Sequence, residues 1–258
     1  MTPTYLQFHL WFVVPPLVGL AVLARHRLSR RALAGIAVLA VVALVYSTPW
    51  DNYLIKRGVW FYGEGTLAVR VGYTPLGEYL FFVFQPVLTG LWLVLVQPSL
   101  DPRQPGRPLW ARLAGTAGWL LVAVAGGALL LTPDGFYLGA ILAWAAPVLA
   151  FQWAAGGNVL WRYRRALAVG VAVPTLYLCA VDRLAIGWGI WTIAAEQSTG
   201  LTVLGLPVEE AIFFLVTNLL VVQGLLLWHW VLARVDAGGV RHGVAGLLPS
   251  ERVMARWR

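Results

Sequence analysis

The chain has 258 residues, of which 60% are hydrophobic and only 12% are charged, and its mean hydropathy is +0.74. A soluble protein of this size could not bury so much apolar surface, so the composition excludes an ordinary soluble enzyme and predicts an integral membrane protein. The single cysteine, Cys179, excludes an internal disulfide and a metal site built from several cysteines.

Seven apolar stretches follow one another along the chain, and most reach the ~17–25 residues that a membrane-spanning helix needs. They cover residues 5–24, 32–50, 76–97, 112–132, 136–154, 166–181 and 208–232. The sixth stretch is short for a full span. The prediction is an all-α integral membrane fold of about seven transmembrane helices.

The formal net charge of +8 is read as a topology signal and not as a nucleic-acid-binding surface. If the helices alternate in direction, fifteen arginines fall on one side and four basic residues on the other. This asymmetry predicts a multi-pass cell-membrane protein with its N-terminus outside and its C-terminus in the cytoplasm, where anionic membrane lipid would be attracted. The fifteen are Arg25, Arg27, Arg30, Arg31, Arg103, Arg107, Arg112, Arg162, Arg164, Arg165, Arg234, Arg241, Arg252, Arg256 and Arg258; the four are Lys56, Arg57, Arg70 and Arg183.

The chain contains an internal repeat. The segment WDNYLIKRGVWFYGEG, from Trp50, resembles VDRLAIGWGIWTIAAEQ, from Val181. Identical residues recur at a shift of 131 positions and, after one extra residue, of 132. The duplication is too extensive to follow from composition alone. The pairs are Asp51 and Asp182, Gly58 and Gly189, Trp60 and Trp191, Glu64 and Glu196, Pro75 and Pro207, Glu78 and Glu210, Phe81 and Phe213, and Phe82 and Phe214.

Equivalent helices are four crossings apart and run in the same direction, so the repeats are parallel. The first repeat covers residues 1–100 with helices one to three, and residues 101–133 hold a linker and a joining fourth helix. The second repeat covers residues 134–232 with helices five to seven, and residues 233–258 form a basic cytoplasmic tail. Both motif blocks then face the same, non-cytoplasmic side.

The connections 51–75 and 182–206 are each about 25 residues long. In the first, β-forming residues flank Gly63-Glu64-Gly65, which is typical of a hairpin, and the second has the same outline. We expect a short hairpin-like cap in each repeat, because a hairpin exposed to lipid would leave backbone groups without partners.

Seven of the eleven acidic residues belong to the repeated blocks and fall on the predicted non-cytoplasmic side. In the segments 78–82 and 210–214, a glutamate precedes two phenylalanines by three and four residues and shares a helix face with them. Acids just after Pro207 could simply favour the positive end of the helix dipole, by ~0.3–1 kcal/mol. A carboxyl group next to two aromatic rings on one helix face, found in both repeats, is more than helix capping requires. Burial would keep its proton available, and the rings could stabilise a cation. The seven are Asp51, Glu64, Glu78, Asp182, Glu196, Glu209 and Glu210.

Asp51 and Asp182 are predicted to end the second and sixth helices, where an anion is disfavoured, so a partner or a function is implied. Capping of the following turn is an equal alternative. Asn218 lies within a span, where an interhelical hydrogen bond is the usual role of such a residue.

Motifs of several other chemistries are absent from the sequence. No G-x-G-x-x-G follows a strand, so no flavin or nicotinamide unit is predicted. Neither H-E-x-x-H nor paired aspartate-rich diphosphate motifs occur, so no metal site is predicted. Lys56, the sole lysine, lies in a connection, which excludes a retinal Schiff base despite seven helices.

The blocks PLGEYLFF and LPVEEAIFF, with the preceding aspartates and the GVW and GIW segments, resemble the heterodimer-type lycopene cyclases of bacteria, archaea and fungi. Many bacterial members carry one block on each of two small subunits, whereas here both halves look fused, over roughly residues 1–232. The resemblance implies an isomerase of carotenoid biosynthesis. Such enzymes convert the ψ ends of lycopene, or of a related linear carotenoid, to β-ionone rings without a cofactor.

The resemblance also implies the chemistry. One carboxyl protonates a terminal alkene, the neighbouring double bond closes a ring on the cation, and a carboxylate removes a ring proton. We expect Glu78 and Glu210 to open into one apolar cavity, closed by Trp60 and Trp191, that the carotenoid enters from the bilayer. Other carotenoid-pathway enzymes are candidate partners. The implied catalytic residues are Glu210, Glu78, Glu209, Asp51 and Asp182; those implied to bind substrate are Trp60, Trp191, Phe81, Phe82, Phe213, Phe214, Asn218, Glu64 and Glu196.

The residues alone leave two other classes of membrane protein open. A transporter or channel can also combine parallel repeats with intramembrane acids, although here the acids lie on one side and do not step across the membrane. A non-catalytic carotenoid- or quinone-binding membrane protein would need a similar apolar pocket.

Overall fold

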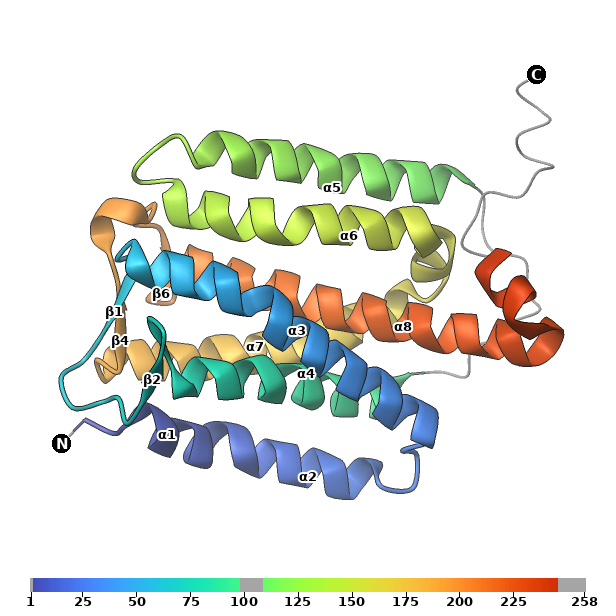
Figure 1. Ribbon diagram of the computed structural model, residues 1–258, viewed down its shortest axis with the longest axis horizontal. Coiled ribbons are helices and arrows are strands. Elements are labelled where there is room, and N and C mark those ends of the chain that lie inside the picture. The colour runs from blue at the N-terminus through green and yellow to red at the C-terminus, as the bar shows by residue number, and fades with distance from the viewer. Residues whose placement is uncertain (1, 98–108, 246–258) are drawn as a thin grey trace.

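The computed structural model describes residues 2–97 and 109–245. Seven helices in this part are long and apolar enough to cross a membrane, which confirms the predicted all-α architecture. They run side by side as a bundle, and the short strands gather at one end of it (Figure 1). Of the residues used to predict orientation, Arg103, Arg107, Arg252, Arg256 and Arg258 lie outside the described residues.

The helices follow the predicted order. The first repeat contains α1 (Tyr5–Phe8), the π-helical turn η1 (His9–Val13), α2 (Val14–Ala24), α3 (Arg30–Lys56) and α4 (Leu76–Val96). The second contains α6 (Phe136–Arg162), α7 (Arg164–Gly187), the 3-10 turn η2 (Ala195–Gln197) and α8 (Val208–Ala245). Between them, α5 (Leu109–Leu129) packs chiefly on α6 at the edge of the bundle (Figure 1). The joining helix therefore does not separate the two motif blocks.

Helices α3 and α7 continue beyond Asp51 and Asp182, to Lys56 and Gly187. The prediction that these aspartates end their helices was wrong, because an apolar run stops at the first charge whereas backbone hydrogen bonding continues past it. Neither aspartate can cap a following turn, so that alternative no longer explains them. Both side chains are buried, with 2% and 3% exposure.

Each connection contains a short hairpin, but its position differs from the prediction. Strands β2 (Arg70–Val71) and β3 (Thr74–Pro75) form one hairpin, and β5 (Thr202–Val203) and β6 (Leu206–Pro207) form the other. Their turns contain Gly72 and Gly205, with φ of 68° and 78°, a region that favours glycine. The predicted turn at Gly63-Glu64-Gly65 does not join two strands of one hairpin.

The strand before Gly63 pairs with the other repeat instead. Strand β1 (Trp60–Tyr62) runs antiparallel to β4 (Trp191–Ile193), with Trp60 opposite Ile193 and Tyr62 opposite Trp191. Because Trp60 and Trp191 are repeat equivalents, exchanging the repeats maps this ladder onto itself, as a two-fold axis would. The pairing joins the repeats and gives each strand's backbone groups partners. The sequence pattern of one connection predicts a hairpin within that connection, but it cannot predict that a strand pairs with the connection of the other repeat.

Candidate active site

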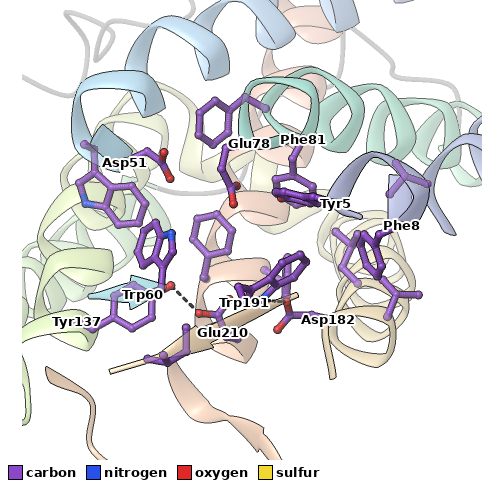
Figure 2. A pocket seen from close by; sticks show the side chains of 18 residues that line it. Tyr5, Phe8, Asp51, Trp60, Glu78, Phe81, Tyr137, Asp182, Trp191 and Glu210 are labelled. Atoms are coloured by element: carbon purple, nitrogen blue, oxygen red, sulfur yellow. Dashed lines mark hydrogen bonds between the residues drawn. The ribbon is translucent and has the colours of Figure 1, made fainter. Parts of the chain in front are cut away.

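Both repeats line one cavity beside the β1–β4 ladder (Figure 2). Four carboxyl groups line it, one from each of the helices α3, α4, α7 and α8. Most of the remaining wall is aromatic, and the ladder itself contributes two tryptophans. The carboxyls are those of Asp51, Glu78, Asp182 and Glu210; the aromatic residues are Tyr5, Phe8, Trp50, Trp60, Phe81, Phe82, Tyr137, Trp191, Phe213 and Phe214.

The two glutamates accept hydrogen bonds from tyrosines. The hydroxyl of Tyr137, on α6, donates to Oε1 of Glu210 at 2.6 Å (Figure 2). The hydroxyl of Tyr62 donates to Oε1 of Glu78 at 2.9 Å, and that of Tyr5 is also within hydrogen-bonding reach of Glu78. Each glutamate begins its helix, in the first turn of α4 or α8, so the helix start directs both carboxyls towards the capped end of the bundle.

The two aspartates have different donors. Thr74 donates its hydroxyl hydrogen to Oδ2 of Asp51 at 2.7 Å, and the indole of Trp191 donates to Oδ1 of Asp182 at 3.1 Å. The second oxygen of Asp182, Oδ2, is buried and has no hydrogen-bond partner among residues 2–97 and 109–245. Asp182 therefore keeps an acceptor position available in the second repeat.

No cation neutralises these acids within the described part of the chain, where the ion pair that is present joins Arg31 and Asp236. All four carboxyls line the same cavity, so an ionised one makes it less favourable to ionise the others. Four such groups in an apolar cavity cannot all be ionised together. The arrangement can therefore hold a proton donor and a proton acceptor at the same time.

Tyr62, on β1, links the ladder to these acids. Its hydroxyl accepts a hydrogen bond from Nε1 of Trp60 at 2.8 Å and donates to Glu78. Burial, together with the nearby charge of Glu78, raises the pKa of the Tyr62 phenol well above its usual value. Tyr62 therefore stays protonated and acts as a hydrogen-bond donor, which fixes the carboxyl of Glu78.

Glu209 does not line the cavity, although it is fully buried. Its Oε1 accepts hydrogen bonds from the backbone nitrogen and the hydroxyl of Thr199, both at 2.7 Å. It therefore ties the second connection to α8. The first repeat has Gly77 at this position because a Cβ there would lie 2.3 Å from the ring of Tyr5. The two blocks differ at this position without losing a cavity carboxyl.

Three other residues predicted to bind substrate lie away from the cavity. Glu64 and Glu196 are exposed, follow the paired strands and do not line the cavity. Asn218 is buried in a polar cluster, where its Oδ1 accepts hydrogen bonds from Gln85 at 2.7 Å and Thr89 at 2.5 Å. This cluster joins α4 to α8, in agreement with the interhelical role expected of such a residue. Trp60, Trp191 and the four phenylalanines do line the cavity.

Tyr5, Tyr62 and Tyr137 were missed in the sequence. Tyr5 and Tyr137 stand 132 positions apart, the same shift as Glu78 and Glu210, so a repeat comparison extended to the first residues would have paired them. Tyr62 offered no such signal, because its repeat equivalent is Ile193.

Comparison with known proteins finds relatives that match over most of the chain. The family model described as lycopene cyclase matches residues 2–95 and again residues 134–227. The lycopene beta-cyclase of Halobacterium salinarum is 53% identical over 239 residues, which cover 91% of this chain and 99% of that protein. The bifunctional lycopene cyclase/phytoene synthases of Gibberella fujikuroi and Phycomyces blakesleeanus are 36% and 35% identical over 90% and 85% of this chain, but over only 41% and 38% of their own length. No solved structure matches the chain.

Proposed function

Because this chain belongs to the lycopene cyclase family, we propose that it converts the ψ ends of lycopene, or of a related linear carotenoid, to β-ionone rings. The observation that carries the proposal is the shared cavity, in which each repeat places one aspartate and one glutamate among aromatic rings. Proton-initiated cyclisation needs an acid, a base and an apolar wall that tolerates a cation, and this cavity supplies all three.

The reaction consists of three steps with no net gain or loss of atoms. A protonated carboxyl gives its proton to the terminal trisubstituted double bond and leaves a tertiary cation. The electrons of the neighbouring double bond form the new carbon–carbon bond that closes the six-membered ring. A carboxylate then removes a ring proton, and the double bond of the β-ring forms. One proton enters and one leaves, so neither an oxidant nor a reductant is needed.

We assign the proton transfers to Glu78 and Glu210, because tyrosine hydroxyls hold both carboxyls beside aromatic rings. Asp51 and Asp182 line the same cavity, and their charge limits how many of the four carboxyls are ionised together. The faces of Phe81 and Phe213 stabilise the cation and exclude water that would trap it as an alcohol.

The protein is proposed to be a multi-pass membrane protein with the cavity near the non-cytoplasmic surface. The arginine clusters of the described helices, at residues 25–31 and 162–165, lie at the end of the bundle opposite the strands (Figure 1). Positive charge favours the cytoplasmic side, so the N-terminus is outside and the C-terminus inside. The substrate and the surrounding lipid are then its partners within the bilayer, and other enzymes of the carotenoid pathway would act on the same membrane.

Production of the protein in a lycopene-accumulating bacterium, followed by pigment extraction and chromatography, tests the proposal. We expect cyclic carotenoid to replace lycopene. Unchanged lycopene in cells with well-inserted protein would contradict it. A transporter is disfavoured because the four acids meet in one cavity and do not form a path across the bundle.

A further inference from the structure

A mostly apolar groove lies beside the acid cavity, between α3, α4, α6 and α8. The rings of Phe81, Phe82 and Phe213 line both spaces. These phenylalanines follow Glu78 and Glu210 by one helical turn, so the groove begins immediately below the carboxyls. Cavity and groove are therefore neighbours with a common wall.

The groove reaches the outer face of the bundle. Val42, Tyr46 and Trp144 line both the groove and a depression on the outer face of α3. Val42 is 52% exposed, and Val41 and Val45 beside the same depression are 60% and 67% exposed. An apolar face of this kind would contact lipid tails, so the groove opens towards the bilayer and not towards water.

Stacked rings separate the outer depression from the acids. Trp50 lines both the depression and the acid cavity. Its ring stacks on that of Trp144, with centroids 4.9 Å apart, and is parallel within 2° to that of Phe213, with centroids 6.0 Å apart. Flat rings in this arrangement fit a flat conjugated chain better than a flexible saturated one, because offset stacking adds to apolar burial.

The length of the groove limits what it can hold. Along α8 it extends to Val221, eleven positions beyond Glu210, which is about 16 Å at the helical rise of 1.5 Å per residue. This is about half of the ~30 Å hydrocarbon thickness of a bilayer. A chain with one end at the carboxyls would be held over this distance and would extend into lipid beyond it.

We propose that this groove binds the linear polyene part of the substrate, which enters from the lipid between α3 and α6. The inference rests on the proposed cyclase function and deepens it. One end of the polyene lies at the carboxyls, the groove holds the adjoining part, and the far end remains in the bilayer. A doubly cyclised product then requires the chain to leave and return with its other end first.

Val42 and Val173 offer a matched test, because they are repeat equivalents at the shift of 131 and are both partly exposed, at 52% and 44%. Val42 lines the groove, whereas Val173 lines neither the groove nor the acid cavity. We expect Val42→Trp to lower the cyclisation rate at limiting lycopene about tenfold, the loss that ~1.4 kcal/mol of binding would cause. Val173→Trp should stay within about twofold of wild type.

Binding is measured separately from catalysis. In a Glu210→Gln background, which should not turn over, the lycopene that co-purifies with the protein is counted per chain with and without each tryptophan. Loss of lycopene with Val42→Trp alone supports the groove. Equal retention in both variants, equal loss in both, or co-purifying phospholipid in place of lycopene would overturn it.

A second substitution guards against a folding defect at Val42. Val148→Phe narrows the groove from α6 and should have the same effect on retention and rate. If neither substitution changes the conversion of lycopene, the groove proposal is overturned and the cyclase function stands. Groove-dependent retention by a wild-type protein that never forms rings would overturn the cyclase function and leave the groove.

Discussion

The hydroxyl of Tyr137 lies 2.6 Å from the carboxylate oxygen of Glu210 that it donates to, and both side chains are buried. Tyr5, the equivalent residue 132 positions earlier, lies within reach of Glu78. Each repeat therefore brings its own tyrosine, from its first helix, to its own glutamate, at the start of its last helix. The two pairs meet in one cavity, and both the β1–β4 ladder and the packing of α3 and α4 on α7 and α8 join the repeats.

Glu210→Gln should lower cyclisation by about 10²–10⁴-fold, the usual contribution of a general acid or base. The amide keeps the size of the side chain and can still accept from Tyr137, so insertion and folding should be preserved. Product formed per milligram of membrane-inserted protein is the measurement. Glu78→Gln is the matched variant in the other repeat, and normal product from both variants would remove the glutamates from the site.

Tyr137→Phe should lower kcat about tenfold and leave KM nearly unchanged, since the lost hydrogen bond orients the carboxyl and not the polyene. Tyr137 is a positioning residue, and a purely structural role would instead lower the amount of inserted protein. The kcat–KM split is measured on purified enzyme in detergent. Tyr177→Phe is a suitable control, because its hydroxyl donates to the backbone carbonyl of Phe12 and it lines neither the acid cavity nor the groove. Equal losses of kcat in the two variants would contradict the assignment.

Much of the fold could be predicted because membrane-spanning helices and duplications produce recognisable patterns in a sequence. The seven apolar stretches and the shifts of 131 and 132 predicted the helices and brought Glu78 and Glu210 to one side. The predicted helix ends were less accurate, because the apolar run stops at Asp51 whereas α3 continues to Lys56. Hydrophobicity reports the lipid-facing part of a helix and not the extent of its hydrogen bonding.

The roles of the site residues were harder to predict where their contacts depend on tertiary packing. Glu209 and Glu210 are adjacent in sequence, yet one accepts hydrogen bonds from Thr199 and the other lines the cavity. Successive residues on a helix point about 100° apart, so one helix start serves two surroundings. The partner of Tyr62 across the ladder is set by pairing between repeats, which no local pattern encodes.

Glu209→Ala should lower stability and affect the chemistry little. It removes two hydrogen bonds from the half-buried Thr199, each of which contributes about 0.5–1.5 kcal/mol. A lower unfolding temperature in detergent with near-normal turnover per folded molecule is the expected result. Glu209→Gln, which keeps an acceptor for Thr199, should restore most of the stability. A complete loss of turnover in a folded Glu209→Gln variant would instead make Glu209 a proton carrier.

Reporter fusions test the orientation. Fusions after Arg31 and after Gly238 should report the cytoplasm, because the arginine-rich end of the bundle favours that side. A fusion after Gly65 should report the opposite side, where the caps and the acid cavity are proposed to lie. A cytoplasmic signal from the Gly65 fusion would reverse the proposed orientation.

Gly77→Ala should reduce cyclisation although alanine is the better helix former by about 1 kcal/mol. A Cβ at this position would lie 2.3 Å from the ring of Tyr5, which is held by stacking on His9, with ring centroids 4.7 Å apart. His9 in turn pairs through Nε2 with the carbonyl oxygen of Gly77 at 2.9 Å, so the ring cannot move without disturbing that contact. Tyr5 must then shift away from Glu78, and kcat should fall about as far as predicted for Tyr137→Phe in the other repeat. Gly19→Ala, on α2 with no neighbouring atom within 4 Å of the added carbon, is the control and should retain full activity. If Gly77→Ala were as active as Gly19→Ala at equal protein level, the contact between Tyr5 and Glu78 would have no role in catalysis, and the two repeats would differ in how they position their acids.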